Sequence, residues 1–347
     1  MTILTKPSVL YPENTLTSDD IVHFIENYHP DSQYRTVAIE MIKHTTIEQR
    51  QTCVPFEAIL NLKGFEGRQR AYEHFARQYS KTVAEQAIIN SGLDAKDITM
   101  VIAVSCTGFM MPSLTAHLIN VLGLNQKTIQ LPVAQMGCVA GAYAMNRAYE
   151  HCQLSKSNNA LIVALEASSL CFDPEANQLQ DFVSDAIFGD GAASVVMKGD
   201  GLGKGLYVQD SESIFLKDTE NYIQYQMTDK GFLFSLDKKV MYSIEMVAPY
   251  LNQFVSTSIS NGSDLDFTIA HTGGRRILDE LEKHLSLSPD KLQHSRASLR
   301  EHGNTSSVSV IDVLYRHFAT AKDGDKGILV AFGPGFTSEV LAGQWQD

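Results

Sequence analysis

The chain has few cysteines for its length, and none of them forms a close pair. Five are spread over 347 residues, at Cys53, Cys106, Cys138, Cys152 and Cys171, with no Cys-x-x-Cys spacing. An odd number of widely separated thiols argues against a disulfide framework and against a structural zinc site. We therefore expect a metal-free protein of a reducing compartment, the cytoplasm.

Long apolar runs and basic clusters are also missing. No uninterrupted apolar stretch reaches the length of a membrane span, and residues 1–7 lack the sustained apolar core of a signal peptide. The formal net charge is −12, and no run of Lys or Arg offsets it. This balance disfavours nucleic acid and anionic membranes as partners, and an anionic substrate would need a local basic patch.

The remaining composition is that of an ordinary globular protein, with 44% hydrophobic and 20% charged residues. Its length allows two domain-sized halves packed as one body. Apolar periodicity predicts mostly helix over residues 17–90, followed by a βαβ alternation. Strands are predicted at 100–105, 129–133 and 160–165, and later at 267–270 and 327–332; helices are predicted at 114–121, 139–152, 240–255, 277–284 and 306–318. The second half loosely repeats the first, which favours an α/β protein with an internal pseudo-repeat.

Cys138 lies where an apolar strand at 129–133, which we expect to be buried, gives way to a helix rich in small residues, between flanking glycines. A helix N-terminus offers unpaired backbone N–H groups and a partial positive charge, which lower the pKa of a thiol and favour the nucleophilic thiolate. The local alternative is a small core cysteine, because free cysteines are among the most buried residues.

Two further polar residues lie at the ends of predicted elements. His271 ends an apolar strand before two glycines, and Asn304 precedes a helix. Each has a structural interpretation, as a histidine bonded to backbone or as a helix N-cap. Together with Cys138 they make chemical sense. A Cys–His pair supplies a thiolate beside an imidazolium, and His and Asn supply two donors that can stabilise an enolate. This set favours acyl transfer followed by carbon–carbon bond formation.

The order of motifs resembles that of the type III polyketide synthases, the chalcone-synthase-like branch of the thiolase fold. The resemblance runs nearly from end to end, and its motifs are Gly137–Gly141, Ile269–Gly274, Gly303–Ser307 and Ala331–Phe336. It implies an α/β thiolase fold of five layers, αβαβα, with two pseudo-duplicated halves. The half at 1–205 would carry the cysteine, the half at 206–347 the histidine and asparagine, and the site would lie in a tunnel between them.

The resemblance also implies a reaction. Cys138 would carry the acyl group, while His271 and Asn304 would hold the thioester carbonyl of malonyl-CoA and stabilise the enolate as carbon dioxide leaves. Residues 105–120 and 271–280 are most similar to the bacterial phloroglucinol synthase branch, which implies that three malonyl units become phloroglucinol. CoA thioesters would be the substrates, with no cofactor and no carrier protein.

Other activities remain open within the fold. Such an enzyme could extend a fatty acyl-CoA starter to an alkylpyrone or alkylresorcinol, or it could be a condensing enzyme similar to ketoacyl synthase III. A catalytically silent scaffold is the alternative from another class of protein.

Two phenylalanines and a methionine match further positions of the family. Phe188 and Phe234 would be the gatekeepers of the cavity, with core aromatics as the alternative. Met111 matches a residue that reaches across the subunit interface, which implies a homodimer.

Four smaller residues resemble positions that shape the cavity. Ser168 and Cys171 would influence chain length, and Cys106 would influence starter choice. Ser306 would lie near the nucleophile. A buried strand-end thiol and a first helical residue are the alternatives for Cys106 and Ser306.

Coenzyme A needs cations at the cleft mouth. Arg50 is the first choice, with Lys43 behind it. Arg275 is a further candidate, for which a solvated arginine at a helix start is the alternative.

Overall fold

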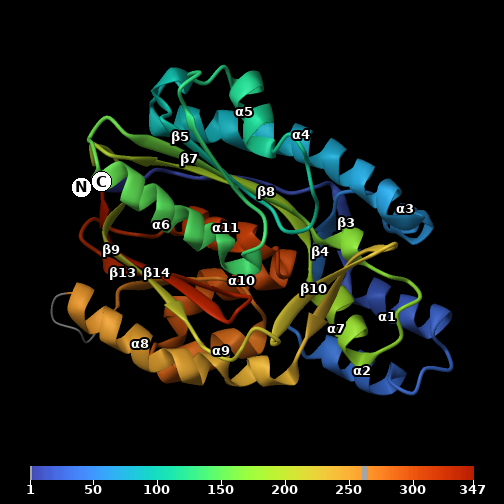
Figure 1. Ribbon diagram of the computed structural model, residues 1–347. Coiled ribbons are helices and arrows are strands. Elements are labelled where there is room, and N and C mark those ends of the chain that lie inside the picture. Colours follow the sequence, from blue (N-terminus) through green and yellow to red (C-terminus); the bar gives the residue numbers. More distant parts are fainter. Residues whose placement is uncertain (1, 260–264) are drawn as a thin grey trace.

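Layers of helices and layers of strands alternate through the fold (Figure 1). The computed structural model describes residues 2–259 and 265–347. The helical layers are α4 (Gly64–Ser91) with α5 (Leu114–Leu122), then α6 (Ala140–Gln153) with α11 (Ser309–His317), then α8 (Ser243–Ser258) with α9 (Arg275–His284) and α10 (Gln293–His302). Strands separate the middle helices from each outer group, which gives the αβαβα order that the resemblance implies.

One hydrogen-bonded path joins the two strand layers, in the order β12-β13-β14-β9-β1-β8-β7-β5-β6. Its strands are β1 (Thr2–Leu4), β5 (Met100–Val104), β6 (Ile129–Val133), β7 (Asn159–Ala167), β8 (Asp190–Lys198), β9 (Gly205–Phe215), β12 (Phe267–Ala270), β13 (Lys326–Gly333) and β14 (Thr337–Gln346), while β2 (Ser8–Leu10) pairs with β8 off the path. Strand β1 pairs antiparallel with β8 on one side and with β9 on the other. The first residues of the chain therefore connect the two strand layers.

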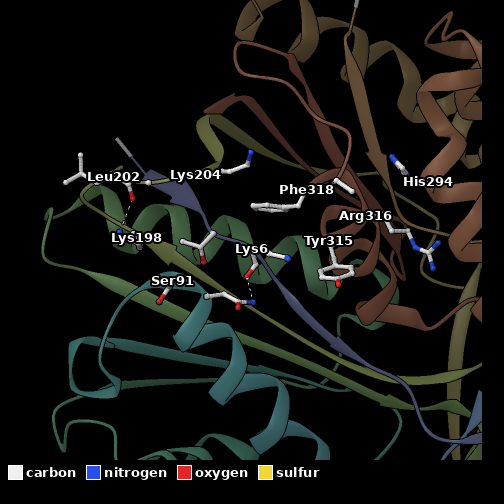
Figure 2. A pocket seen from close by; sticks show the side chains of 13 residues that line it. Lys6, Ser91, Lys198, Leu202, Lys204, His294, Tyr315, Arg316 and Phe318 are labelled. Atoms are coloured by element: carbon white, nitrogen blue, oxygen red, sulfur yellow. Dashed lines mark hydrogen bonds between the residues drawn. The ribbon is translucent and has the colours of Figure 1, made fainter. Parts of the chain in front are cut away.

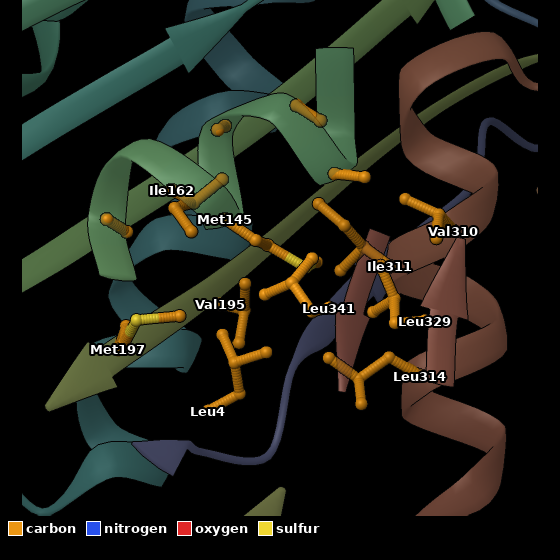
Figure 3. Packing of buried hydrophobic residues seen from close by; sticks show 14 of the residues in the cluster. Leu4, Met145, Ile162, Val195, Met197, Val310, Ile311, Leu314, Leu329 and Leu341 are labelled. Carbon is orange, nitrogen blue, oxygen red and sulfur yellow. The ribbon is translucent and has the colours of Figure 1, made fainter. Parts of the chain in front are cut away.

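Both faces of the central strands are buried, which explains their continuous apolar sequences. Alternate residues of β7 face opposite cores. Leu161, Val163 and Leu165 pack on the side of α4 and α5, whereas Ala160, Ile162 and Ala164 pack on the side of α6 and α11. Figure 3 shows the latter core, where Met145 of α6 and Ile311 of α11 meet Ile162 and Leu329 from the two strand layers. The buried middle helices are thus held between apolar faces on both sides.

A group of smaller elements covers one end of the layers (Figure 1). It comprises α1 (Ser18–Tyr28), α2 (Arg35–Lys43), α3 (Phe56–Asn61), α7 (Leu179–Ile187), the β3 (Asn14–Thr17)–β4 (Gln49–Thr52) pair and the β10 (Ile223–Thr228)–β11 (Gly231–Leu236) pair. Helices α1, α2, α3 and α7 share an apolar cluster of their own. Two elements of this group hold the predicted gatekeepers: Phe188 directly follows α7, and Phe234 lies in β11.

The predicted repeat is visible in two matched turns. A 3₁₀ turn at Gly137–Val139 precedes α6, and another at Ser306–Val308 precedes α11. Gly137 and Gly303 both have positive φ, 56° and 67°, which glycine adopts without strain. Two details differ from the sequence predictions. Strand β4 interrupts the mostly helical region at 17–90, and β6 is an edge strand rather than a buried one, with Ile129 half exposed. None of the helices in the two described ranges is long and apolar enough to cross a membrane.

Candidate active site

Cys138, His271 and Asn304 line one pocket of about 330 Å³. Cys138 comes from the turn before α6, His271 follows β12, and Asn304 lies between α10 and α11. The turns that precede α6 and α11 and the end of strand β12 thus meet at this pocket. The sequence predicts that these three side chains share a cleft, and the structure has them in the same one.

The glycines around Cys138 allow two backbones to approach closely. A Cβ added to Gly141 would lie 2.3 Å from the carbonyl oxygen of Ser307, and one added to Gly137 would lie 2.7 Å from Pro334 Cδ. Both distances are far shorter than a carbon atom tolerates. The absence of a side chain at Gly141 therefore lets α6 pack against the turn that carries Asn304, and its absence at Gly137 lets the nucleophile turn pack against Pro334.

Burial changes the expected acidity of the nucleophile. It raises the pKa of Cys138 to about 11, while hydrogen bonds with Ser306 and Asn304 lower the pKa less strongly. The sequence predicts a lowered pKa from the helix N-terminus, but it does not reveal that the thiol lies in an enclosed pocket, into which it is partly exposed. The prediction of a lowered thiol pKa is therefore corrected: enclosure acts in the opposite direction and is the larger influence.

Hydrogen bonds fix the tautomer of His271. Its Nδ1 lies 2.6 Å from Ser309 Oγ, and Ser309 Oγ donates its only hydrogen to the Ser306 carbonyl oxygen at 2.9 Å. The tautomer with the proton on Nδ1 satisfies both bonds, because His271 then donates to Ser309 while Ser309 donates to Ser306, and it leaves Nε2 as an acceptor. Burial lowers the pKa of His271 to about 3, so the imidazole on its own is neutral at pH 7.

Burial disfavours a lone thiolate and a lone imidazolium alike. Moving the thiol proton from Cys138 to Nε2 of His271 would create both charges together, and their attraction at short range offsets the desolvation of each. His271 Nε2–H would then be a hydrogen-bond donor. The pair is suited to generating a nucleophile and a donor in one proton transfer.

The side-chain amide of Asn304 is oriented by its own chain. Its Oδ1 accepts a hydrogen bond from the Ser306 backbone N–H at 2.9 Å, which leaves the NH₂ group free to donate. Its backbone N–H donates to Ile187 O at 2.8 Å, and its carbonyl accepts from Gly189 N at 3.1 Å. These bonds connect the asparagine turn to both neighbours of Phe188.

Glu166 is a functional candidate that the sequence analysis missed. It is fully buried in β7 and accepts hydrogen bonds from Cys106 N at 3.1 Å, Thr107 Oγ1 at 2.9 Å and Ser307 Oγ at 2.5 Å. Ser306 also reaches it, at 3.3 Å. The carboxylate joins the loop after β5 to the asparagine turn. The sequence does carry one signal for Glu166, because it is the single acidic residue of the otherwise largely apolar strand β7.

Cys106 and Ser306 lie close to this carboxylate and to each other. Their Sγ and Oγ atoms are 3.7 Å apart, and Ser306 also hydrogen-bonds to Cys138. Ser306 has a φ of 50°, a conformation that is rare for residues other than glycine and is often found at functional sites. Both predicted cavity residues therefore lie next to the nucleophile.

Phe188 and Phe234 separate the pocket from a smaller chamber. Their ring centroids are 4.9 Å apart at an interplanar angle of 76°, and both rings line both spaces. The chamber has a volume of about 40 Å³, and its walls include Ser168 and Cys171. The two phenylalanines thus lie where gatekeepers are predicted, with the two predicted cavity residues behind them.

The prediction that Arg50 lies at the pocket mouth is wrong. Arg50 is only 1% exposed, and its Nη2 lies 3.5 Å from Ser18 Oγ inside the small-element end of the molecule. Lys43 is exposed and pairs with Glu40 at 3.3 Å. The cations that line the pocket are Arg275 and Arg276, both exposed at the start of α9. The packing of α1 and α7 around β4, which buries Arg50, is not visible in the sequence.

Met111 lies away from this pocket. It is 84% exposed, in the loop that leads to α5, and so its own subunit does not cover it.

A larger cleft of about 710 Å³ lies elsewhere (Figure 2). Lys6, Lys198, Tyr315 and Phe318 are among its lining residues, and cysteine is not. Within residues 2–259 and 265–347, no three His, Cys, Asp or Glu side chains are grouped so that they could hold a metal ion.

The fold and the site together define a class. Five alternating layers with Cys, His and Asn at a buried pocket are the arrangement of a thiolase-fold condensing enzyme. The chain belongs to the chalcone and stilbene synthase family, and it is a type III polyketide synthase. The model of the family's N-terminal domain matches residues 32–201, and that of the C-terminal domain matches residues 207–343.

Several relatives resemble the chain over nearly its whole length. Phloroglucinol synthase of Pseudomonas fluorescens strain Pf-5 is 47% identical, over 99% of both chains. The 1,3,6,8-tetrahydroxynaphthalene synthase of Streptomyces coelicolor is 40% identical over all of this chain and 93% of the relative. The crystal structure of tetrahydroxynaphthalene synthase from S. coelicolor superposes with a TM-score of 0.97 over 99% of both chains. Germicidin synthase of S. coelicolor, at 23% identity and a TM-score of 0.92 over 99% of both chains, shares the fold.

Proposed function

We propose that this enzyme condenses malonyl units from malonyl-CoA and joins three of them into phloroglucinol. The observation that carries the proposal is the pocket shared by Cys138, His271 and Asn304, which a pair of phenylalanines also lines. The choice of product draws support from the relative named phloroglucinol synthase, at 47% identity. The small chamber behind the phenylalanines, about 40 Å³, also suits a short chain.

The proposed reaction begins at Cys138. Its thiol proton passes to His271 Nε2, and the sulfur attacks the thioester carbonyl of the starter. CoA leaves as a thiolate that takes a proton from solvent, so that the Cys138 proton stays on His271 Nε2. The Cys138 thioester then holds the growing chain. This use of a thiol as a carrier splits one difficult transfer into two easier ones.

Extension needs a stabilised carbanion. Asn304 Nδ2–H and His271 Nε2–H would donate hydrogen bonds to the thioester oxygen of a second malonyl-CoA while its carbon–carboxylate bond breaks and carbon dioxide leaves. The enolate carbon attacks the acyl carbon on Cys138, and the carbon–sulfur bond breaks. The extended chain is then a CoA thioester, and it returns to Cys138 with release of CoA, which reloads the nucleophile for the next round. Ring closure by attack of a chain carbon on the Cys138 thioester, with loss of the terminal carboxyl group of the malonyl starter as carbon dioxide, would free the product. The proposed chemistry uses the side chains and CoA thioesters, without a cofactor or a carrier protein.

The phosphates of CoA would bind at the start of α9. Arg275 and Arg276 line the pocket there, and the N-terminus of a helix also attracts anions. This assignment replaces Arg50.

Two other products have specific support. The tetrahydroxynaphthalene synthase at 40% identity favours a longer malonyl chain. The many apolar side chains of the pocket, which include Ile187, Ile223 and Val240, would also accept a fatty acyl starter and an alkylpyrone product.

We also propose a homodimer. The support is the exposure of Met111 and Phe109, at 84% and 56%, together with the open edge of β6. Light scattering after size-exclusion chromatography tests it: a mass of one chain at micromolar concentration would contradict the proposal.

The product is tested by incubating the purified enzyme with malonyl-CoA alone, then with acyl-CoA starters, and identifying products by mass spectrometry. Cys138→Ala is the control. Phloroglucinol from malonyl-CoA alone supports the proposal. Tetrahydroxynaphthalene, or alkylpyrones that need a starter, would overturn the product and keep the enzyme class. If Cys138→Ala were as active as the parent, the assigned nucleophile would be wrong.

A further inference from the structure

The hydroxyl of Ser309, the first residue of α11, is fully buried beside His271. Its oxygen lies 2.6 Å from Nδ1 of His271, and it accepts a hydrogen bond from the backbone N–H of Thr272 at 3.4 Å. Its hydrogen goes to the Ser306 carbonyl oxygen at 2.9 Å. Because a hydroxyl has one hydrogen and two lone pairs, these three contacts use all of its hydrogen-bonding capacity.

One of these contacts is local and another is not. A serine at the start of a helix often bonds to the carbonyl three residues back for local reasons alone, and the bond from Ser309 to Ser306 has this spacing. The contact with His271 spans 38 residues of chain. It connects the catalytic histidine to the turn before α11, which also carries Asn304.

The backbone of Ser306 holds both sides of this turn. Its N–H donates to Asn304 Oδ1 at 2.9 Å, and its carbonyl oxygen accepts the hydrogen of Ser309. The φ of Ser306 is 50°, in the left-handed region that residues with a side chain rarely adopt. The backbone conformation of this one residue therefore sets the direction of the Asn304 amide relative to the hydroxyl that contacts His271.

We propose that Ser309 is a positioning residue that orients both donors of the site, His271 directly and Asn304 through the backbone of Ser306. This inference rests on the proposed function of the pocket, in which His271 Nε2 takes the Cys138 proton and both donors then bind the thioester oxygen. With Nδ1–H bonded to Ser309, Nε2 remains the acceptor. Without the hydroxyl, the tautomer with its proton on Nε2 becomes competitive, and that tautomer cannot take the thiol proton.

The first test measures how readily Cys138 forms its thiolate. Ser309→Ala should slow alkylation by iodoacetamide at pH 7, read at Cys138 by peptide mass spectrometry. Partners that orient metal-bound histidines are worth about 10–100-fold, and we expect the lower figure, about 10-fold. Ser309→Thr keeps the hydroxyl and should restore most of the rate. Alkylation of Ser309→Ala as fast as the parent, or faster, would overturn the inference.

The matched control is Ser298→Ala in α10. It removes a serine hydroxyl that is equally buried but lacks a hydrogen-bond partner among the described residues. Its alkylation rate should equal that of the parent. If the added methyl group keeps Ser309→Thr from being recovered folded, Ser309→Cys offers a donor and an acceptor at the same position.

The second test asks whether Ser309 acts through both donors. The release of carbon dioxide from malonyl-CoA labelled in its free carboxyl group is measured for Ser309→Ala, and again when this change is added to His271→Ala and to Asn304→Ala. In the parent we expect a loss of about 10–100-fold. The loss should be smaller in each of the other two enzymes, because Ser309 can no longer act through the missing side chain.

Two results of the second test would overturn the inference. A full loss in both enzymes would mean that the role of Ser309 is merely structural. A full loss in Asn304→Ala alone would mean that Ser309 acts on the histidine only. If the parent released no carbon dioxide from malonyl-CoA, the proposed function would be wrong, whereas the alkylation rates would still decide whether Ser309 holds the acceptor tautomer. A product other than phloroglucinol would change neither measurement.

Discussion

Replacing Gly141 by alanine should damage both stability and activity. The added Cβ would lie 2.3 Å from the Ser307 carbonyl oxygen and 2.8 Å from Val310 Cγ1. An ordinary contact needs about 3.4 Å, so the two backbones must separate by about 1 Å, and a backbone oxygen cannot rotate away.

The magnitude follows from two opposing effects. Overpacking a well-packed site costs about 1–3 kcal/mol, and the gain in helix propensity from glycine to alanine returns up to about 1 kcal/mol. Since the clash is with backbone, we take the upper part of the range and expect a net loss of about 2 kcal/mol in the free energy of unfolding. The movement would shift the Asn304 turn relative to Cys138. A misplacement of about 1 Å can lower a rate about 100-fold.

Urea unfolding measures the stability, and CoA release from malonyl-CoA measures the activity. The matched control is Gly67→Ala in α4, where the nearest atom to the new Cβ would be Leu62 Cδ2 at 3.8 Å. That variant should be stabilised by about 0.5–1 kcal/mol, with unchanged activity. If Gly141→Ala matched the parent in both assays, close approach of α6 to the asparagine turn would not be a requirement of the site.

Three further changes test the site. His271→Ala removes the acceptor for the Cys138 proton, so the apparent pKa of the thiol should rise toward about 11 and the thiolate fraction at pH 7 should fall. The rate of alkylation by iodoacetamide from pH 5 to 10 measures the thiolate fraction. An unchanged pH profile of that rate would contradict the proton transfer. Glu166→Gln replaces an acceptor of several hydrogen bonds with a group that also donates. We expect the free energy of unfolding in urea to fall by about 1–3 kcal/mol, and kcat to fall by more than any change in KM. Wild-type values in both assays would show that the carboxylate does not hold the site together. Arg50→Met should leave the KM for malonyl-CoA unchanged and the free energy of unfolding equal or higher. The reason is that Nε and Nη1 of this buried guanidinium lack hydrogen-bond partners among the described residues. A tenfold rise in KM would show that Arg50 contributes to CoA binding after all.

The sequence was informative where function depends on short local patterns. Cys138, His271 and Asn304 each lie at the end of an element and within two residues of a glycine, so motif, element end and turn coincide. Apolar periodicity likewise predicted β6 and β12 with the bounds that the structure has.

The residues that were missed or misplaced depend on contacts between distant segments. Glu166 meets Cys106 and Ser307 across 60 and 141 residues of chain, and no local pattern announces those partners. The sequence analysis places Arg50 at the mouth of the cleft because coenzyme A needs cations there. Its burial arises only when the small elements pack together at one end of the fold.

The position of β1 has a consequence for how the protein is made. Thr2–Leu4 pair with residues 197–198 and 206–208, so their sheet partners are about 200 residues away along the chain. At translation rates of about 5–20 residues per second, the first strand waits about 10–40 s for those partners to be synthesised. The two strand layers therefore join late during synthesis. A fusion partner attached ahead of Thr2 needs a linker long enough for this strand to enter the sheet after the partner has folded.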